Sequence, residues 1–107
     1  MWEIQKKGFK GFLAIEKSLS DNSIEAYLRD IDKLTQYLEL ENKNHLTPTQ
    51  ITLEDLQHFL ASIYELGLSA RSQARIISGI KAFYNYLIIE NLSDKNPAEL
   101  LESPKLG

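Results

Sequence analysis

The sequence of 107 residues contains no cysteine, which excludes disulfide bonds and thiolate metal sites. Its two histidines, His45 and His58, have neither the HxxxH nor the HxH spacing of a metal site. No apolar run approaches the roughly 20 residues needed to cross a membrane, and the first residues lack the continuous apolar segment of a signal peptide. We therefore expect one cytoplasmic domain with no metal, no cofactor and no membrane partner.

Motifs for catalysis are missing as well. The chain has no glycine-rich phosphate loop and no Ser/His/Asp arrangement. Closely spaced acids, such as Asp30 with Asp32 and Glu54 with Asp55, are interpreted as solvated charges on exposed helix faces. Neither an active site nor a small-molecule substrate is predicted.

Positive charge is in the minority, with 12 Lys and Arg against 15 Asp and Glu and a formal net charge of −3. Taken alone, this balance argues against nucleic-acid binding, because such domains are usually basic. The charges are unevenly distributed, however. Residues 1–18 carry four lysines against two glutamates, and residues 39–65 carry five acids against one lysine. The folded molecule is expected to have a basic side and an acidic side.

Helical periodicity is present in four segments, which indicates an all-α domain. The first segment covers roughly residues 3–17, and its expected apolar face consists of Ile4, Phe9, Phe12 and Leu13, with Trp2 as a candidate further member. Gly8 and Gly11 lie inside it, and they indicate a close helix crossing or a bent first turn, because glycine is otherwise unfavourable in a helix. A weak, partly frayed terminal helix is the alternative.

Capping residues mark the next two helices. Ser20, or alternatively Asn22, begins a helix that runs to about Leu38. A loop over residues 39–51 follows. Thr52 then starts a third helix with a capping box, and Gly67 ends it.

Ser69 begins the longest helix, which extends to about residue 90. A turn over residues 91–96 separates it from a short helix that starts at Asn96-Pro97, with proline at the first helical position. That short helix is expected to carry Ala98, Leu100 and Leu101.

The longest helix carries only positive charge, since Arg71, Arg75 and Lys81 are the charged residues between positions 66 and 89. At about 100° per residue, the face opposite Ile80 combines arginines with small or polar residues. Its members are Arg71, Arg75, Ser78, Ala82 and Asn85. The second helix has a similar stripe opposite Ile31, made of Asn22, Ala26, Arg29 and Lys33.

These two polar stripes admit two interpretations. Arg71 and Arg75 lie one turn apart and could enter one DNA groove, where arginine reads guanine or neutralises phosphate. The amides from Ser69 to Ser72 lie at a helix N-terminus, where phosphate can bind. The stripes could equally be the solvated faces of an ordinary bundle, and the pattern alone does not decide between the two.

The order of the segments closely resembles the N-terminal core-binding domain of tyrosine recombinases, the phage integrase family, and most of all its Xer type. Three stretches carry the resemblance. They are Ser20–Tyr27–Asp30, the S-A-R-S-x-A-R run over residues 69–75, and the end from Asn96-Pro97 to Ser103-Pro104-Lys105.

The resemblance implies a core-binding domain over residues 1–102, built as a four-helix, SAM-like bundle of two crossed helix pairs with a short C-terminal helix. Such a domain forms one half of a C-shaped clamp on a recombination half-site in double-stranded DNA, with the second and fourth helices facing the major groove. Ser23 and Arg29 would lie near the DNA backbone, and Arg71, Ser72, Arg75 and Lys81 in or along the groove. Together with the stripe and cap residues, the predicted DNA-binding set is Asn22, Ser23, Arg29, Ser69, Arg71, Ser72, Arg75, Ser78 and Lys81.

The resemblance assigns DNA cleavage and rejoining to a second domain, whose Arg, Lys, His, Arg and tyrosine nucleophile have no counterpart in these 107 residues. Residues 103–107 would begin the linker to that domain, and other recombinase protomers would be protein partners of the full-length protein. The tyrosines of this chain are not predicted to be nucleophiles, and Tyr27 and Tyr84 are expected to face the apolar side. The alternative function is a small all-α protein-interaction module without DNA binding, with the acidic side of the third helix as its contact surface.

Overall fold

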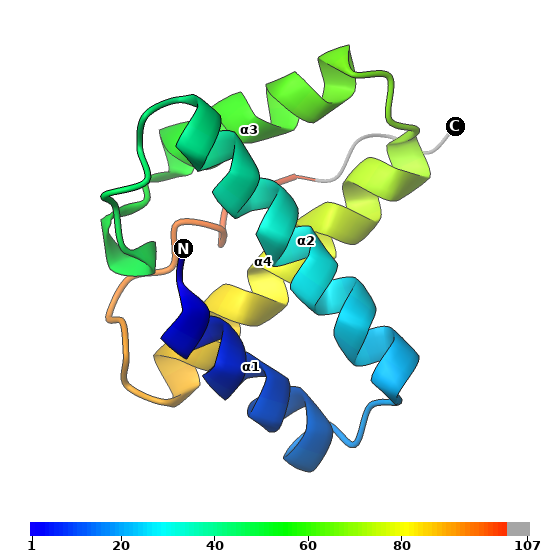
Figure 1. Ribbon diagram of the computed structural model, residues 1–107, viewed down its shortest axis with the longest axis vertical. Helices are drawn as coiled ribbons and strands as arrows, with labels where there is room; N and C mark the ends of the chain where they lie inside the picture. The colour runs from blue at the N-terminus through cyan, green and yellow to red at the C-terminus, as the bar shows by residue number, and fades with distance from the viewer. Residues whose placement is uncertain (103–107) are drawn as a thin grey trace.

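The computed structural model describes residues 1–102. The four α-helices are α1 (Glu3–Ile15), α2 (Asp21–Leu40), α3 (Leu53–Glu65) and α4 (Ala70–Ile89). In Figure 1, α1 and α2 form one antiparallel pair, α3 and α4 form another, and α2 crosses α4 near the middle of both. The predicted all-α domain of four helices is confirmed, and no strand occurs within residues 1–102. None of the helices in this range is long and apolar enough to cross a bilayer.

The predicted capping residues begin the helices. The Oγ of Ser20 accepts a hydrogen bond from the Ser23 amide, so Ser20 rather than Asn22 caps α2. Thr52 and Asp55 form the predicted capping box of α3. Gly67 follows the end of α3 at a φ of 87°, a left-handed conformation that glycine adopts without steric cost. Local sequence therefore determines where these helices start and stop.

The first helix differs from its predicted apolar face. Ile4 is 83% exposed, and the preceding Trp2 is buried instead. The Trp2 ring stacks on Phe83 with 5.8 Å between centroids, and its indole Nε1 donates to the Leu46 carbonyl at 2.9 Å. One large aromatic side chain thus fills the space at the start of α1, and the prediction for Ile4 was wrong.

Gly8 permits the close packing of α1 on α4. A Cβ atom at Gly8 would overlap the hydroxyl of Tyr86, a largely buried residue on α4. At Gly11, by contrast, a Cβ would meet nothing within 4 Å. The close-crossing interpretation therefore holds for Gly8 and not for Gly11.

Two parts of the connecting chain differ from the sequence analysis. A 3-10 helix, η1 (Pro48–Gln50), lies inside the expected loop. The prediction of a short helix starting at Asn96-Pro97 was wrong, because residues 97–100 form turns instead. The Asn96 side chain accepts from the Ala98 amide at 3.0 Å and satisfies it locally. A segment this short gains too few helical hydrogen bonds to offset the cost of nucleation. The predicted linker, residues 103–107, lies outside the described residues.

Tyr84 joins η1 to the core. Its hydroxyl is buried and donates to the Pro48 carbonyl at 2.9 Å. Burial raises the pKa of this phenol far above its ordinary value, so Tyr84 is a neutral donor. We expect Tyr84→Phe to lower the free energy of unfolding by about 1 kcal/mol, because the Pro48 carbonyl loses its buried partner. Chemical denaturation checks this, with Tyr64→Phe as the control at a 70% exposed tyrosine. Equal stability of the two variants would contradict it.

Candidate nucleic-acid interface

The crossing of α2 and α4 brings two unexpected residues together. Asp30 lies midway along the 20-residue α2, and Gly79 lies midway along the 20-residue α4. A Cβ at Gly79 would come within 2.6 Å of the Asp30 Oδ2 and 3.0 Å of the Asp30 Cβ. Glycine is therefore what allows the two helices to approach this closely around a carboxylate.

Asp30 is only 1% exposed, so the interpretation of this residue as a solvated surface acid was wrong. Its Oδ1 lies 2.8 Å from the Nη1 of Arg75 on α4. Oδ1 has no aligned hydrogen-bond donor among the described residues, so the contact is an ion pair. Burial raises the pKa of Asp30, and the Arg75 guanidinium opposes that shift.

Around this ion pair the two polar stripes meet. A surface hollow is lined by Ser23, Ala26 and Tyr27 of α2 and by Arg75 and Ser78 of α4, with Asp30 at its base. The structure thus places three of the predicted DNA-binding residues, Ser23, Arg75 and Ser78, around one hollow. From the crossing, the N-terminal halves of α2 and α4 diverge (Figure 1).

The two diverging helix ends have the same cap. Ser20 donates its hydroxyl to the Ser23 Oγ, and Ser69 donates to the Ser72 Oγ, each at 3.1 Å. In both helices the cap Oγ accepts from the later serine's amide. The first turn of α4 has no acidic residue, whereas that of α2 has one and that of α3 has two. The end of α4 is therefore the more attractive of the two for an anion.

The remaining predicted residues are less closely grouped. Asn22, Arg29 and Arg71 are exposed. Within residues 1–102, neither arginine has a carboxylate in ion-pair range. Lys81 is half-buried and does not line the hollow. The α4 stripe is also not continuous, because Ala82 and Asn85 line a separate hollow beside the end of α1.

Two lysines form ion pairs with acidic residues away from the hollow. Lys6 of α1 pairs with Asp32 at 2.8 Å, and Lys43 pairs with Asp55 at 2.8 Å. Asp55 is partly desolvated, yet its bonds to Lys43 and Thr52 hold its pKa below the usual range. These two ion pairs reduce the availability of Lys6 and Lys43 for binding an anion.

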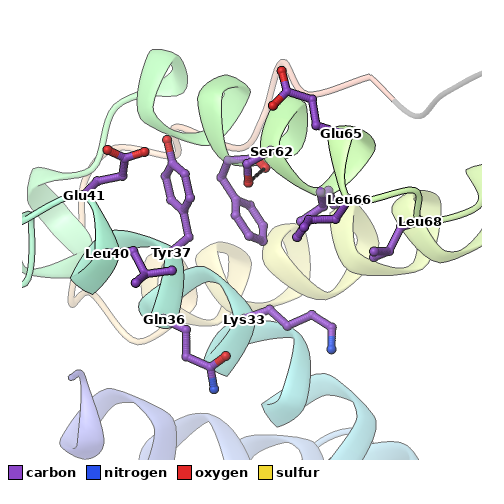
Figure 2. Close-up of a pocket in the computed structure, with 11 residues that line it drawn as sticks. Lys33, Gln36, Tyr37, Leu40, Glu41, Ser62, Glu65, Leu66 and Leu68 are labelled. Carbon is purple, nitrogen blue, oxygen red and sulfur yellow. Dashed lines mark hydrogen bonds between the residues drawn. The ribbon is translucent and has the colours of Figure 1, made fainter.

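A second concave region lies between the C-terminal halves of α2 and α3. It is lined mainly by apolar side chains, including Leu40, Leu66 and Leu68, and Figure 2 shows Glu41 and Glu65 at its edge. Lys33, which was predicted to extend the α2 stripe, lines this groove as well. Its acids disfavour phosphate, so the groove is not a candidate for binding a nucleic-acid backbone.

Asp30 is the site residue that sequence reasoning missed as a functional candidate. A signal was available in Gly79, because a glycine inside a strongly helical pattern often marks close packing. Which residue of another helix meets that glycine could not be read from periodicity.

Comparison with known proteins agrees with this fold. The family model described as phage integrase, N-terminal SAM-like domain, matches residues 7–91. The chain belongs to this family of tyrosine recombinases, and the region that matches is its N-terminal SAM-like domain.

Individual relatives are named tyrosine recombinase XerD. The protein of Staphylococcus saprophyticus is 38% identical over 94 residues, covering 88% of this chain and 31% of the relative. That of Chlorobaculum tepidum is 33% identical over 106 residues, covering 99% of this chain and 34% of the relative. That of Staphylococcus aureus is 39% identical over 94 residues, covering 88% and 31%. The chain thus spans about a third of the length of these curated relatives. No solved structure gives a significant match.

Proposed function

We propose that this chain is a DNA-binding, core-binding domain that clamps one face of a recombination half-site. The observation that carries the proposal is the hollow at the α2–α4 crossing, where Ser23 of α2 lies with Arg75 and Ser78 of α4. Arg29 and Arg71 are exposed on the same two helices. Strand exchange itself is proposed for a catalytic domain joined through residues 103–107. Other recombinase protomers would be its protein partners, and the cytoplasm its location.

Charge and shape support contact with duplex DNA. The major groove is about 12 Å wide and admits an α-helix. The N-terminus of α4 combines free amides, a serine cap and Arg71 without a neighbouring acid in its first turn. Such an end attracts phosphate through both its dipole and its donors. The overall charge of −3 matters less than this local arrangement.

The test is binding of the chain to a pool of random duplex DNA at several salt concentrations. We expect Arg29→Ala and Arg71→Ala each to flatten the plot of log affinity against log salt by about 0.9, because each removes one phosphate contact. The slope reports the number of ions released and does not require the natural target sequence.

Lys95→Ala is the matched control. Lys95 is an exposed cation beyond the other end of α4, so its removal changes the net charge without changing the proposed face. We expect it to leave the slope unchanged. The proposal is wrong if the wild-type chain does not bind duplex DNA, or if Lys95→Ala acts as strongly as Arg71→Ala.

A further inference from the structure

The buried carboxylate of Asp30 is unusual for a helix crossing. A charged group taken out of water costs free energy unless it is paired and hydrogen-bonded. Asp30 is 1% exposed, and within residues 1–102 its ion-pair partner is Arg75 alone, at 2.8 Å. Burial raises its pKa, so the fold gains stability as the pH falls through that raised pKa, and the charged form of Asp30 is the less stable one. Stability of the fold therefore does not account for an aspartate at this position.

Arg75 is placed differently from its partner. Its side chain is 48% exposed, so one part of the guanidinium contacts the buried carboxylate while the rest faces the hollow. Gly79 lies one turn further along α4 and packs against the other carboxylate oxygen. The Asp30 carboxylate thus lies between Arg75 and Gly79 of α4, and its contact with the Arg75 guanidinium restricts the movement of that group.

We propose that Asp30 is a positioning residue that holds the Arg75 guanidinium in one orientation, so that Arg75 discriminates between DNA sequences. This inference rests on the proposed function. A guanidinium presents its donors in a rigid planar fork, and recognition of guanine requires that the fork be correctly oriented. An arginine side chain that rotates freely would instead contact the nearest phosphate, whatever the base sequence.

The Asp30–Arg75 ion pair is expected to improve discrimination between DNA sequences but to weaken the affinity for DNA of any sequence. The carboxylate neutralises Arg75 and so reduces its attraction to phosphates. Removal of the Asp30 charge is therefore expected to strengthen binding to arbitrary DNA and to weaken discrimination. Loss of an ordinary structural residue would not change both quantities in this way.

The test compares Asp30→Asn with Asp32→Asn. Both variants remove one negative charge from α2, and both break a 2.8 Å ion pair, but Asp32 pairs with Lys6 of α1 and does not line the hollow. Discrimination is measured as the affinity for duplexes that the wild-type chain enriches from a random pool, divided by the affinity for the unselected pool. We expect Asp30→Asn to lower this ratio by about tenfold and Asp32→Asn to leave it unchanged.

A second measurement determines the mobility of the Arg75 side chain by NMR in the absence of DNA. In the wild-type chain and in Asp32→Asn, the Arg75 Nε–H group is expected to give a resolved NMR signal with restricted fast motion. In Asp30→Asn the restriction is expected to be lost while the backbone spectrum remains that of the folded domain. An Arg75 side chain that is equally mobile in all three proteins would overturn the proposal.

The two proposals fail in different ways. Absence of DNA binding by the wild-type chain would overturn the proposed function and the DNA-reading role of Asp30 together. Binding by the wild-type chain, with equal discrimination ratios for Asp30→Asn and Asp32→Asn, would overturn the role of Asp30 alone.

Discussion

Arg71→Glu is expected to remove most of the affinity for duplex DNA while the domain stays folded. Arg71 is exposed at the second residue of α4, where the helix dipole and free amides favour an anion. Glutamate there removes one cation and places a negative charge against the phosphate. We expect the affinity at low salt to fall roughly tenfold to a hundredfold, and fluorescence anisotropy with random duplex DNA measures it.

Arg71→Glu is expected to raise the stability of the domain while it lowers the affinity for DNA. The first turn of α4 has no acidic residue, and a glutamate at this place interacts favourably with the helix N-terminus. The expected gain in the free energy of unfolding is about 0.3–1 kcal/mol. Weaker binding by a more stable protein would separate DNA contact from folding. A large loss of stability in Arg71→Glu would contradict this explanation.

Glu54→Arg is the reciprocal control. Glu54 is the second residue of α3 and is exposed, so it matches Arg71 in helix position and differs in location on the molecule. We expect a small loss of stability, because a cation replaces an acid in the first turn, and no loss of DNA affinity. A gain of DNA affinity in Glu54→Arg as large as the loss in Arg71→Glu would mean that helix-end charge in general, rather than the α2–α4 face, controls binding.

Gly79→Ala is expected to cause the largest loss of stability among the variants considered. The new Cβ would lie 2.6 Å from the Asp30 Oδ2 and 3.0 Å from the Asp30 Cβ. Because the Asp30 Cβ is fixed to the α2 backbone, rotation of the side chain cannot relieve the contact. The helices must separate, and overpacking of this kind costs about 1–3 kcal/mol. Thermal and chemical denaturation measure the loss.

Gly11→Ala provides the matched substitution in α1. A Cβ there meets nothing within 4 Å, so only helix propensity changes, and a gain of up to about 1 kcal/mol is expected. A stabilising effect at both positions would show that the close approach at Gly79 is not tightly packed. The double variant Asp30→Ala with Gly79→Ala should recover part of the loss, since the shortened side chain leaves only the Asp30 Cβ contact.

Much of the secondary structure could be read from local patterns. The caps at Ser20, Thr52 and Ser69 satisfy amides within three residues, so the sequence near each helix start contains the whole interaction. The polar stripe predicted for α4 lies opposite Ile80, and Ile80 is fully buried, as are Ile76 and Phe83.

The errors arose where the partner lies far along the chain. Ile4 is exposed, whereas the Trp2 ring is buried by stacking on Phe83, a residue far along the chain. At the C-terminal end, Ala98 and Leu101 are buried without forming a helix, because their contacts with the core do not depend on helical geometry. Helical periodicity alone neither distinguishes the buried Trp2 from the exposed Ile4 nor predicts the burial of Ala98 and Leu101 outside a helix.

By itself, the sequence determined where α2, α3 and α4 begin, the family resemblance and the acid-free surface of α4, since all of these depend on order and spacing along the chain. Only the tertiary structure decided how the arginines differ. Arg71 remains exposed at a helix end, whereas Arg75 pairs with the carboxylate of Asp30 on α2, far from it along the chain. The physical reason is the close crossing at Gly79, which buries Asp30 beside Arg75 and which no pattern within a single helix specifies.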